Sequence, residues 1–126
     1  ITNHLDVTTR VSMEVYRRVL DTLHYACGGK IGLAAMDATS MEMDGENSDY
    51  YVSIPRRVEG VEIGVLFKAD GPETTRLSIR SRAYANVSEL AAHFGGGGHV
   101  RAAGCTIHLP MAEAEAAFLA EAEKYI

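Results

Sequence analysis

The sequence predicts a mixed α/β (α+β) fold in a single domain, with a mixed β-sheet of about four to five strands flanked by helices. Three observations carry this prediction. The chain has 126 residues, enough for one domain with a core of its own. Apolar residues recur every three to four positions in some segments and at every second position in others, so helices alternate with strands. No apolar run reaches the roughly eighteen residues of a membrane span.

The first expected element is an amphipathic helix that Thr8 or Thr9 caps and that runs to about Cys27. Gly28 and Gly29 would end it. Its apolar stripe recurs at every fourth position: Val11, Val15, Val19 and Leu23. Residues 1–7 resemble the end of a linker, with neither an initiator Met nor a basic and then apolar leader, so we expect a cut boundary there rather than a signal peptide.

The middle of the chain predicts three strands. Residues 31–36 are a short apolar run consistent with a buried strand, and the acidic stretch from Asp37 to Tyr51 is expected to hold a short helix and a loop. Residues 61–68 and 76–82 both alternate, and the turn at residues 70–72 joins them into an antiparallel hairpin. In its second strand one face is apolar, with Leu77 and Ile79, and the other polar: Arg76, Ser78, Arg80 and Arg82.

The last third predicts a helix, a strand and a helix. Asn86 and Glu89 form a capping-box pattern, and Gly95 ends the helix that they open. Residues 105–109 are expected to form a strand, and Pro110 opens the terminal helix. The apolar stripe of this terminal helix is Met111, Ala114, Phe118, Ala122 and Tyr125.

Four consecutive glycines, Gly95–Gly98, directly precede His99. Each glycine in a regular element costs about 0.5–1 kcal/mol relative to alanine, so the run needs a compensating reason. A connector is the commoner role of oligoglycine, but the patterned helix before the run and the strand after it favour ligand contact. Successive N–H groups can form a concave nest for a phosphate, with His99 and Arg101 at its mouth.

The charge pattern indicates a small anionic ligand. The net charge of −5 argues against a broad basic surface for long nucleic acid. Between residues 76 and 101 four arginines (Arg76, Arg80, Arg82 and Arg101) stand against one acid, Glu89. Arg80 and Arg82 can be solvated or can clamp a phosphate, and both interpretations stay open at this point. His99 is likewise either a surface residue or a hydrogen-bond donor to phosphate.

The sequence lacks the motifs of a P-loop and of a metal-dependent hydrolase, and its two cysteines do not form a metal or redox motif. The glycine run lacks the lysine and Ser/Thr of a P-loop. The histidines show no ligand spacing with the aspartates, and no Asp-His-His triplet occurs, so we expect the chain to bind without cutting. Cys27 and Cys105 are expected to be buried free thiols in a reducing cytoplasm.

The string FGGGGHVRAAG, preceded by SIRSR and by VEGVEIGVLFK, resembles the C-terminal DHH-associated, substrate-binding domain of DHH-family phosphoesterases. Within that family it is most similar to the NrnA-type branch of nanoRNases and pAp phosphatases, and less to RecJ-type exonucleases or cyclic-di-AMP phosphodiesterases. The resemblance covers nearly the whole chain, with residues 8–126 as the domain. It implies that this domain grips the substrate of a two-domain enzyme.

The resemblance also implies site residues and a cofactor. It puts Gly96, Gly97, Gly98 and His99 on a phosphate-contacting loop and Arg80 with Ser81 on a substrate-contacting strand; our own interpretation adds Arg82 and Arg101. The N-terminal DHH domain of such enzymes holds two metal ions, typically manganese, and performs the cleavage. That domain is missing from this sequence, so the chain alone is expected to be inactive and to have no cofactor of its own.

The expected partners are a short oligonucleotide or nucleotide phosphate and the DHH domain of the same parent chain, in the cytoplasm and without a membrane. The substrate stays open among nanoRNA, pAp and a cyclic dinucleotide. Other classes also stay open: an RNA-binding accessory domain like that of alanyl-tRNA synthetases, or a purely structural or dimerisation domain.

Overall fold

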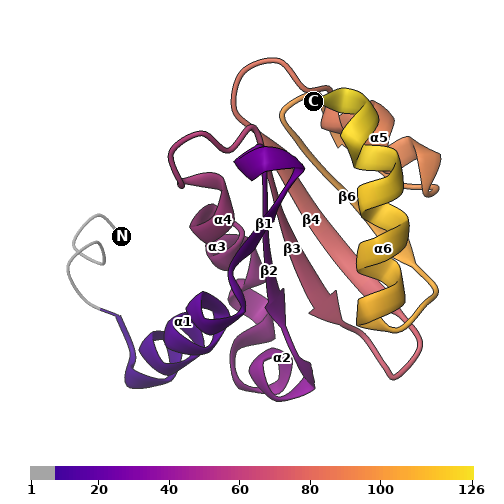
Figure 1. Ribbon diagram of the computed structural model, residues 1–126. Coiled ribbons are helices and arrows are strands. Elements are labelled where there is room, and N and C mark those ends of the chain that lie inside the picture. The colour runs from indigo at the N-terminus through magenta and orange to yellow at the C-terminus, as the bar shows by residue number, and fades with distance from the viewer. Residues whose placement is uncertain (1–7) are drawn as a thin grey trace.

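One mixed sheet organises the chain in a computed structural model that describes residues 8–126 (Figure 1). Among these residues six strands lie in the order β1-β2-β3-β4-β6-β5, and only β2 and β3 pair in parallel. The strands are β1 (His24–Ala26), β2 (Ile31–Met36), β3 (Ile63–Ala69), β4 (Thr75–Ser81), β5 (Gly97–His99) and β6 (Ala102–Ile107). The predicted α+β class is confirmed, with one strand more than the upper expected count. The predicted linker end, residues 1–7, lies outside the described residues.

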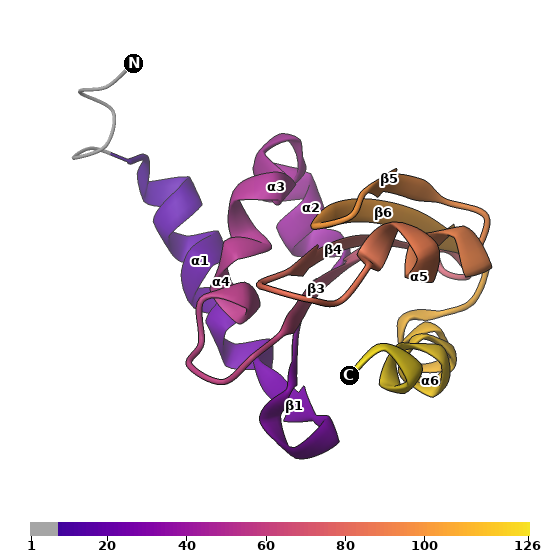
Figure 2. The same cartoon turned by 90° about the horizontal axis from the view of Figure 1, so that it is seen from above.

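Helices cover the two faces of the sheet unequally. One face carries α5 (Val87–His93) and α6 (Met111–Ala122). The other carries four N-terminal helices, and Figure 2 shows β5 and β6 at the end of the sheet away from α1. These helices are α1 (Arg10–Thr22), α2 (Ala38–Asp44), α3 (Ser48–Tyr51) and α4 (Ser53–Arg56). Short 3₁₀ turns occupy Cys27–Gly29, Gly45–Asn47 and Glu123–Tyr125.

The larger core lies between the sheet and α5 and α6. Leu77 and Ile79 of β4 are buried there, as the alternation of this strand predicts. Phe118 of α6 meets the Phe67 ring edge-on at a centroid distance of 5.7 Å. The predicted cap of α5 is confirmed, because the Asn86 side chain accepts a hydrogen bond from the Glu89 N–H at 3.1 Å.

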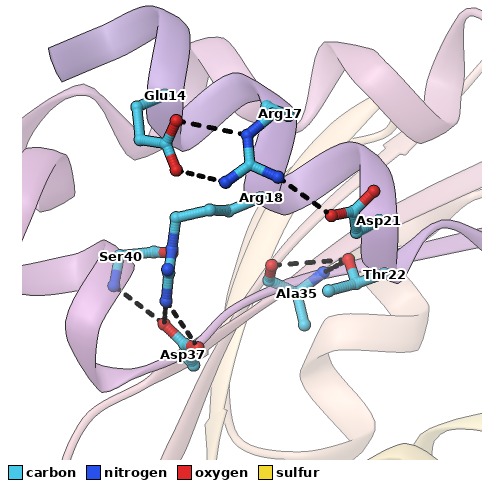
Figure 3. Close-up of polar contacts among 8 residues, drawn as sticks. All are labelled: Glu14, Arg17, Arg18, Asp21, Thr22, Ala35, Asp37 and Ser40. Carbon is cyan, nitrogen blue, oxygen red and sulfur yellow. Dashed lines mark hydrogen bonds and ion pairs between the residues drawn. The ribbon is translucent and has the colours of Figure 1, made fainter.

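The smaller core lies under the N-terminal helices and is fixed by polar contacts at its rim. Val15 and Val19 of α1 are fully buried against β2 and β3. Arg18 donates to both carboxylate oxygens of Asp37, at 3.2 and 3.0 Å, and Thr22 Oγ1 accepts from the Ala35 N–H at 2.8 Å (Figure 3). These contacts hold α1 against the end of β2 and the start of α2.

The structure departs from the predicted elements near Cys27. The first helix ends at Thr22 rather than at about Cys27, because Leu23 is already extended (φ −62°, ψ 126°) and β1 pairs with β2. The expectation that both cysteines are buried is wrong for Cys27, which is exposed in the turn after this edge strand. Cys105 is buried, and burial raises the pKa of its thiol to about 11.

Candidate anion-binding site

Among residues 8–126, no helix packs on half of one sheet face. The N-terminal helices pack on β2 and β3, whereas the same face of β4, β6 and β5 borders a pocket of about 800 Å³. Strands β4, β5 and β6 supply most of its walls, and Lys68 reaches it from β3. This pocket is the candidate functional site.

The strand register arranges the residues of this face in three rows. Directly opposite residues of neighbouring strands project to the same side of a sheet. The first row is Arg80, Ala102 and His99; the second is Ser78, Gly104 and Gly97; the third is Lys68, Arg76 and Thr106. The pairing therefore puts Arg80 and His99, far apart in the sequence, on one face about two strand spacings, or roughly 10 Å, apart.

The glycine run forms an edge strand in this site instead of the expected concave nest. Gly95 ends α5 with φ +84°, where the N–H groups of Gly95 and Gly96 donate to Ala92 O at 3.0 Å and Ala91 O at 2.9 Å. Gly97–His99 then pair with β6 as β5. The structure thus places Gly97–His99 on the exposed edge of the sheet rather than in a loop, and their contact with a ligand stays a prediction.

Three of the four glycines have structural reasons for lacking a side chain. Gly95 is left-handed, a Cβ on Gly96 would lie 2.1 Å from Gly104 O, and a Cβ on Gly98 would lie 2.7 Å from Ala102 O. Gly97 differs, because its Cβ would meet nothing within 4 Å. Of the run, Gly97 alone has neither a left-handed backbone nor a close neighbour to explain the glycine, and it lines the pocket.

The pocket has an excess of positive charge. Lys68, Arg76 and Arg80 line it, and Asp49 of α3 is the only carboxylate among the described lining residues. Asp49 lies 3.9 Å from Arg80, and its own side chain is 83% exposed, so it screens Arg80 weakly. Arg80 otherwise donates to the carbonyl of the adjacent Ile79 at 3.0 Å.

Lys68 lines the pocket but is not among the site residues that the sequence predicts. It is only 4% exposed, and its Nζ donates to Ser78 Oγ at 2.7 Å. Burial lowers its pKa, the charges of Arg76 and Arg80 act in the same direction, and Asp49 opposes them. The signal available in the sequence was a lysine inside an otherwise apolar strand, Ile63–Ala69.

Four of the predicted site residues are not among those that line the pocket: Ser81, Arg82, His99 and Arg101. The Ser81 hydroxyl donates to Val100 O at 3.4 Å on the other side of β4. Arg82 donates to the carbonyls of Arg56 and Val61 at 2.7 and 3.1 Å. Arg101 donates to the carbonyls of Ala83 and Ala85 at 2.6 and 2.7 Å. These guanidinium groups fix the loop between β4 and α5.

Glu62 fixes the same loop, so that Glu62, Arg82 and Arg101 together form a frame around the pocket. Its carboxylate accepts hydrogen bonds from the N–H groups of Ala83, Tyr84 and Ala85 at 2.7–3.2 Å. Burial by itself would raise its pKa, but these N–H donors and the charge of Arg101 outweigh burial and hold the pKa below its usual range. The loop beside His99 and Val100 is therefore held by an ionised carboxylate.

The described residues do not fit a metal centre. Within residues 8–126, no group of three or more His, Cys, Asp or Glu side chains could hold an ion. The manganese pair that the resemblance implies for a DHH domain thus has no ligand set among these residues. No helix in this part of the chain combines the length and the apolar character that crossing a membrane requires.

A bare sheet face with three cations and one carboxylate defines a domain whose pocket suits an anionic ligand. Residues 28–126 match the family model of the DHHA1 domain. The chain belongs to the DHHA1 domain family, which confirms the resemblance stated for its sequence.

Individual relatives agree with this membership. A protein of Thermus thermophilus named bifunctional oligoribonuclease and PAP phosphatase NrnA is 38% identical over 92 residues, which is 71% of this chain and 27% of the relative. The chain thus spans about a quarter of that curated relative.

Two solved structures share the fold. An exopolyphosphatase-related protein from Bacteroides fragilis superimposes with a TM-score of 0.84 and 24% identity, over 95% of this chain and 36% of that chain. The pGpG-specific phosphodiesterase PggH from Vibrio cholerae gives 0.58 and 13% identity, over 88% of this chain and 37% of that one.

Proposed function

We propose that this chain is the substrate-binding domain of a DHH-family phosphoesterase, and that its pocket binds the phosphate of short oligoribonucleotides or of pAp. The observation that carries the proposal is the row across three strands that brings Arg80 and His99 onto one face beside Gly97. A guanidinium binds phosphate in a bidentate manner, and an imidazole can donate one more hydrogen bond. The NrnA relative from Thermus thermophilus supports this substrate class.

Hydrolysis belongs in this proposal to a DHH domain of the same parent protein, which holds two manganese ions. This chain contributes affinity and orientation, because holding a phosphodiester in position lowers the entropic part of the barrier to its cleavage. Ser81, Arg82 and Arg101 act from behind the pocket by fixing the strand end and the loop that border it. A cytoplasmic location suits the exposed thiol of Cys27, which stays reduced there.

An NMR titration of the chain tests the proposal. Millimolar pAp should shift the amide signals of Gly97, Gly98 and His99 and leave those of α1 unchanged. Arg80→Gln should weaken pAp binding about tenfold or more, because it removes a charge-assisted hydrogen bond to phosphate. The matched control is Arg10→Gln at the exposed start of α1, which should bind as the wild type does.

Gly97→Ala supplies a second variant, because the added methyl group meets no protein atom and so reports on the ligand. We expect it to weaken pAp binding at least threefold with an unchanged melting temperature. No amide shift at millimolar pAp or cyclic dinucleotide would refute the proposal. Steeply salt-dependent binding of structured RNA in its place would identify an RNA-binding accessory domain, which the net charge of −5 disfavours.

A further inference from the structure

Lys68 is a buried cation without a carboxylate partner. The described residues place no Asp or Glu oxygen within 4.0 Å of its Nζ, and the one hydrogen bond that it makes there goes to Ser78 Oγ. An ammonium has three donors, and a buried charge is costly unless it is paired. Since Lys68 lines the pocket, its remaining donors are available to a ligand from that side.

A second cation and two hydroxyl groups lie on the same sheet face as this ammonium. Arg76 lies directly opposite Lys68 on β4, and Thr106 lies opposite Arg76 on β6. Arg76 is exposed and, within residues 8–126, forms no ion pair. Lys68, Arg76, Ser78 and Thr106 all line the pocket, in the two rows that do not contain Arg80.

The spacing of the rows separates this cluster from Arg80. Lys68 Nζ reaches Ser78, which lies two residues before Arg80 on β4, so about 7 Å of strand separates them. One nucleotide unit of an extended chain covers such a span. Gly104 and Gly97 lie in the same row as Ser78, and this part of the floor leaves room for a sugar ring against the backbone.

We propose that Lys68, Arg76 and Ser78 form a second anion subsite that binds a further phosphate of the same ligand, one nucleotide unit away from the phosphate at Arg80. The pocket then selects nucleotides that carry two phosphates, such as a nucleoside 3′,5′-bisphosphate or a dinucleotide with a terminal phosphate. This assignment rests on the phosphate site at Arg80 proposed above. It makes Lys68 a specificity residue, since it binds the phosphate that distinguishes these ligands from a monophosphate.

Calorimetric titration of the wild-type chain with pAp, 5′-AMP and 3′-AMP tests the subsite. The wild type should prefer pAp over both monophosphates by tenfold or more. In Lys68→Met, a substitution of similar shape, the preference should fall to within twofold of the better monophosphate, whose own affinity stays unchanged. Lys124→Met is the matched control, because Lys124 is exposed and pairs with Glu121 on the C-terminal helical segment.

Arg76→Gln is a second variant that leaves the buried floor intact, and it should lower the affinity for pAp about threefold without affecting either monophosphate. Unchanged pAp preference in both variants would overturn the second subsite and leave the site at Arg80 standing. A loss of monophosphate affinity equal to the loss for pAp would also overturn it. If the wild type bound none of the three nucleotides, both proposals would fall together.

Discussion

Arg80 and Arg101 lie at the same end of the sheet and carry the same charged group, but the fold uses them differently. Arg101 donates to the backbone carbonyls of residues 83 and 85, and Arg82 donates to those of residues 56 and 61 near α4. Arg80 has one adjacent carbonyl and a distant, exposed carboxylate. Arg82 and Arg101 thus hold the loops around the pocket in place, whereas Arg80 remains available to a ligand.

The same distinction runs through the glycines and the carboxylates. Gly96 is required by packing and Gly97 is not. Glu62 is buried with three N–H donors, whereas Asp49 is almost fully solvated. An arginine or a glycine that suggests phosphate binding in the sequence is therefore available to a ligand only where the fold does not already use it for internal contacts.

The largest expected effect contrasts two adjacent glycines. Gly96→Ala should lower the free energy of unfolding by about 3 kcal/mol, because its methyl group would overlap Gly104 O and the Cys105 side chain. Gly97→Ala should change it by less than about 0.5 kcal/mol. Urea denaturation of both variants measures the difference. Equal destabilisation would mean that Gly97 also belongs to the frame.

Glu62→Gln should break the frame without touching the pocket cations. Placing an amide against three N–H donors leaves some of them without an acceptor, at a cost of about 2 kcal/mol at pH 7. The folded-state pKa of Glu62 lies below its ordinary 4.5, so its carboxylate stabilises the fold above that pH and stops doing so as the pH falls through the folded pKa.

Urea denaturation at several pH values measures this effect. The difference between wild type and Glu62→Gln should therefore shrink below about pH 4.5. The exposed Glu59→Gln is the control and should show no such dependence. A Glu62→Gln difference that stayed constant down to pH 3 would contradict an ionised Glu62.

The sequence correctly predicted the features that follow from local patterns of apolar residues and from helix-capping residues. The apolar face of β4, the Asn86 cap and the stripe of α6 are local patterns, and each is found as expected. It failed for β1 and β5, three-residue strands that exist because β2 and β6 pair with them. The sequence before β1 hides that strand, because Leu23 continues the apolar period of the helix. The sequence of β5 begins with two glycines, which have no side chains to alternate.

The site was predicted in part for the same reason. Arg80, His99 and the glycines stand in recognisable motifs, and strand pairing brings them together. Whether an arginine side chain is already hydrogen-bonded inside the protein depends on carbonyl groups from loops distant in sequence. Arg82, for example, donates to the carbonyl of Arg56. Lys68 was missed because it occupies a polar position of an alternating strand, and its burial depends on the helices that cover the two faces of β3.

The smallest expected effect concerns Lys68 itself. If its ammonium is held for a ligand rather than for the fold, Lys68→Met should raise the free energy of unfolding by about 1 kcal/mol at pH 7, because it removes a buried charge. The lowered pKa of Lys68 means that the unfolded chain binds more protons between the folded pKa and 10.5, so the wild type gains stability as the pH rises through this window.

The advantage of Lys68→Met should accordingly decrease toward pH 10.5, while exposed Lys124→Met should remain within about 0.5 kcal/mol of the wild type throughout. Thermal denaturation between pH 7 and 10.5 measures both curves. A destabilised Lys68→Met at pH 7 would place Lys68 with Arg101 in the frame. A stabilised one would show that the fold retains a charge against its own stability, as a residue kept for binding requires.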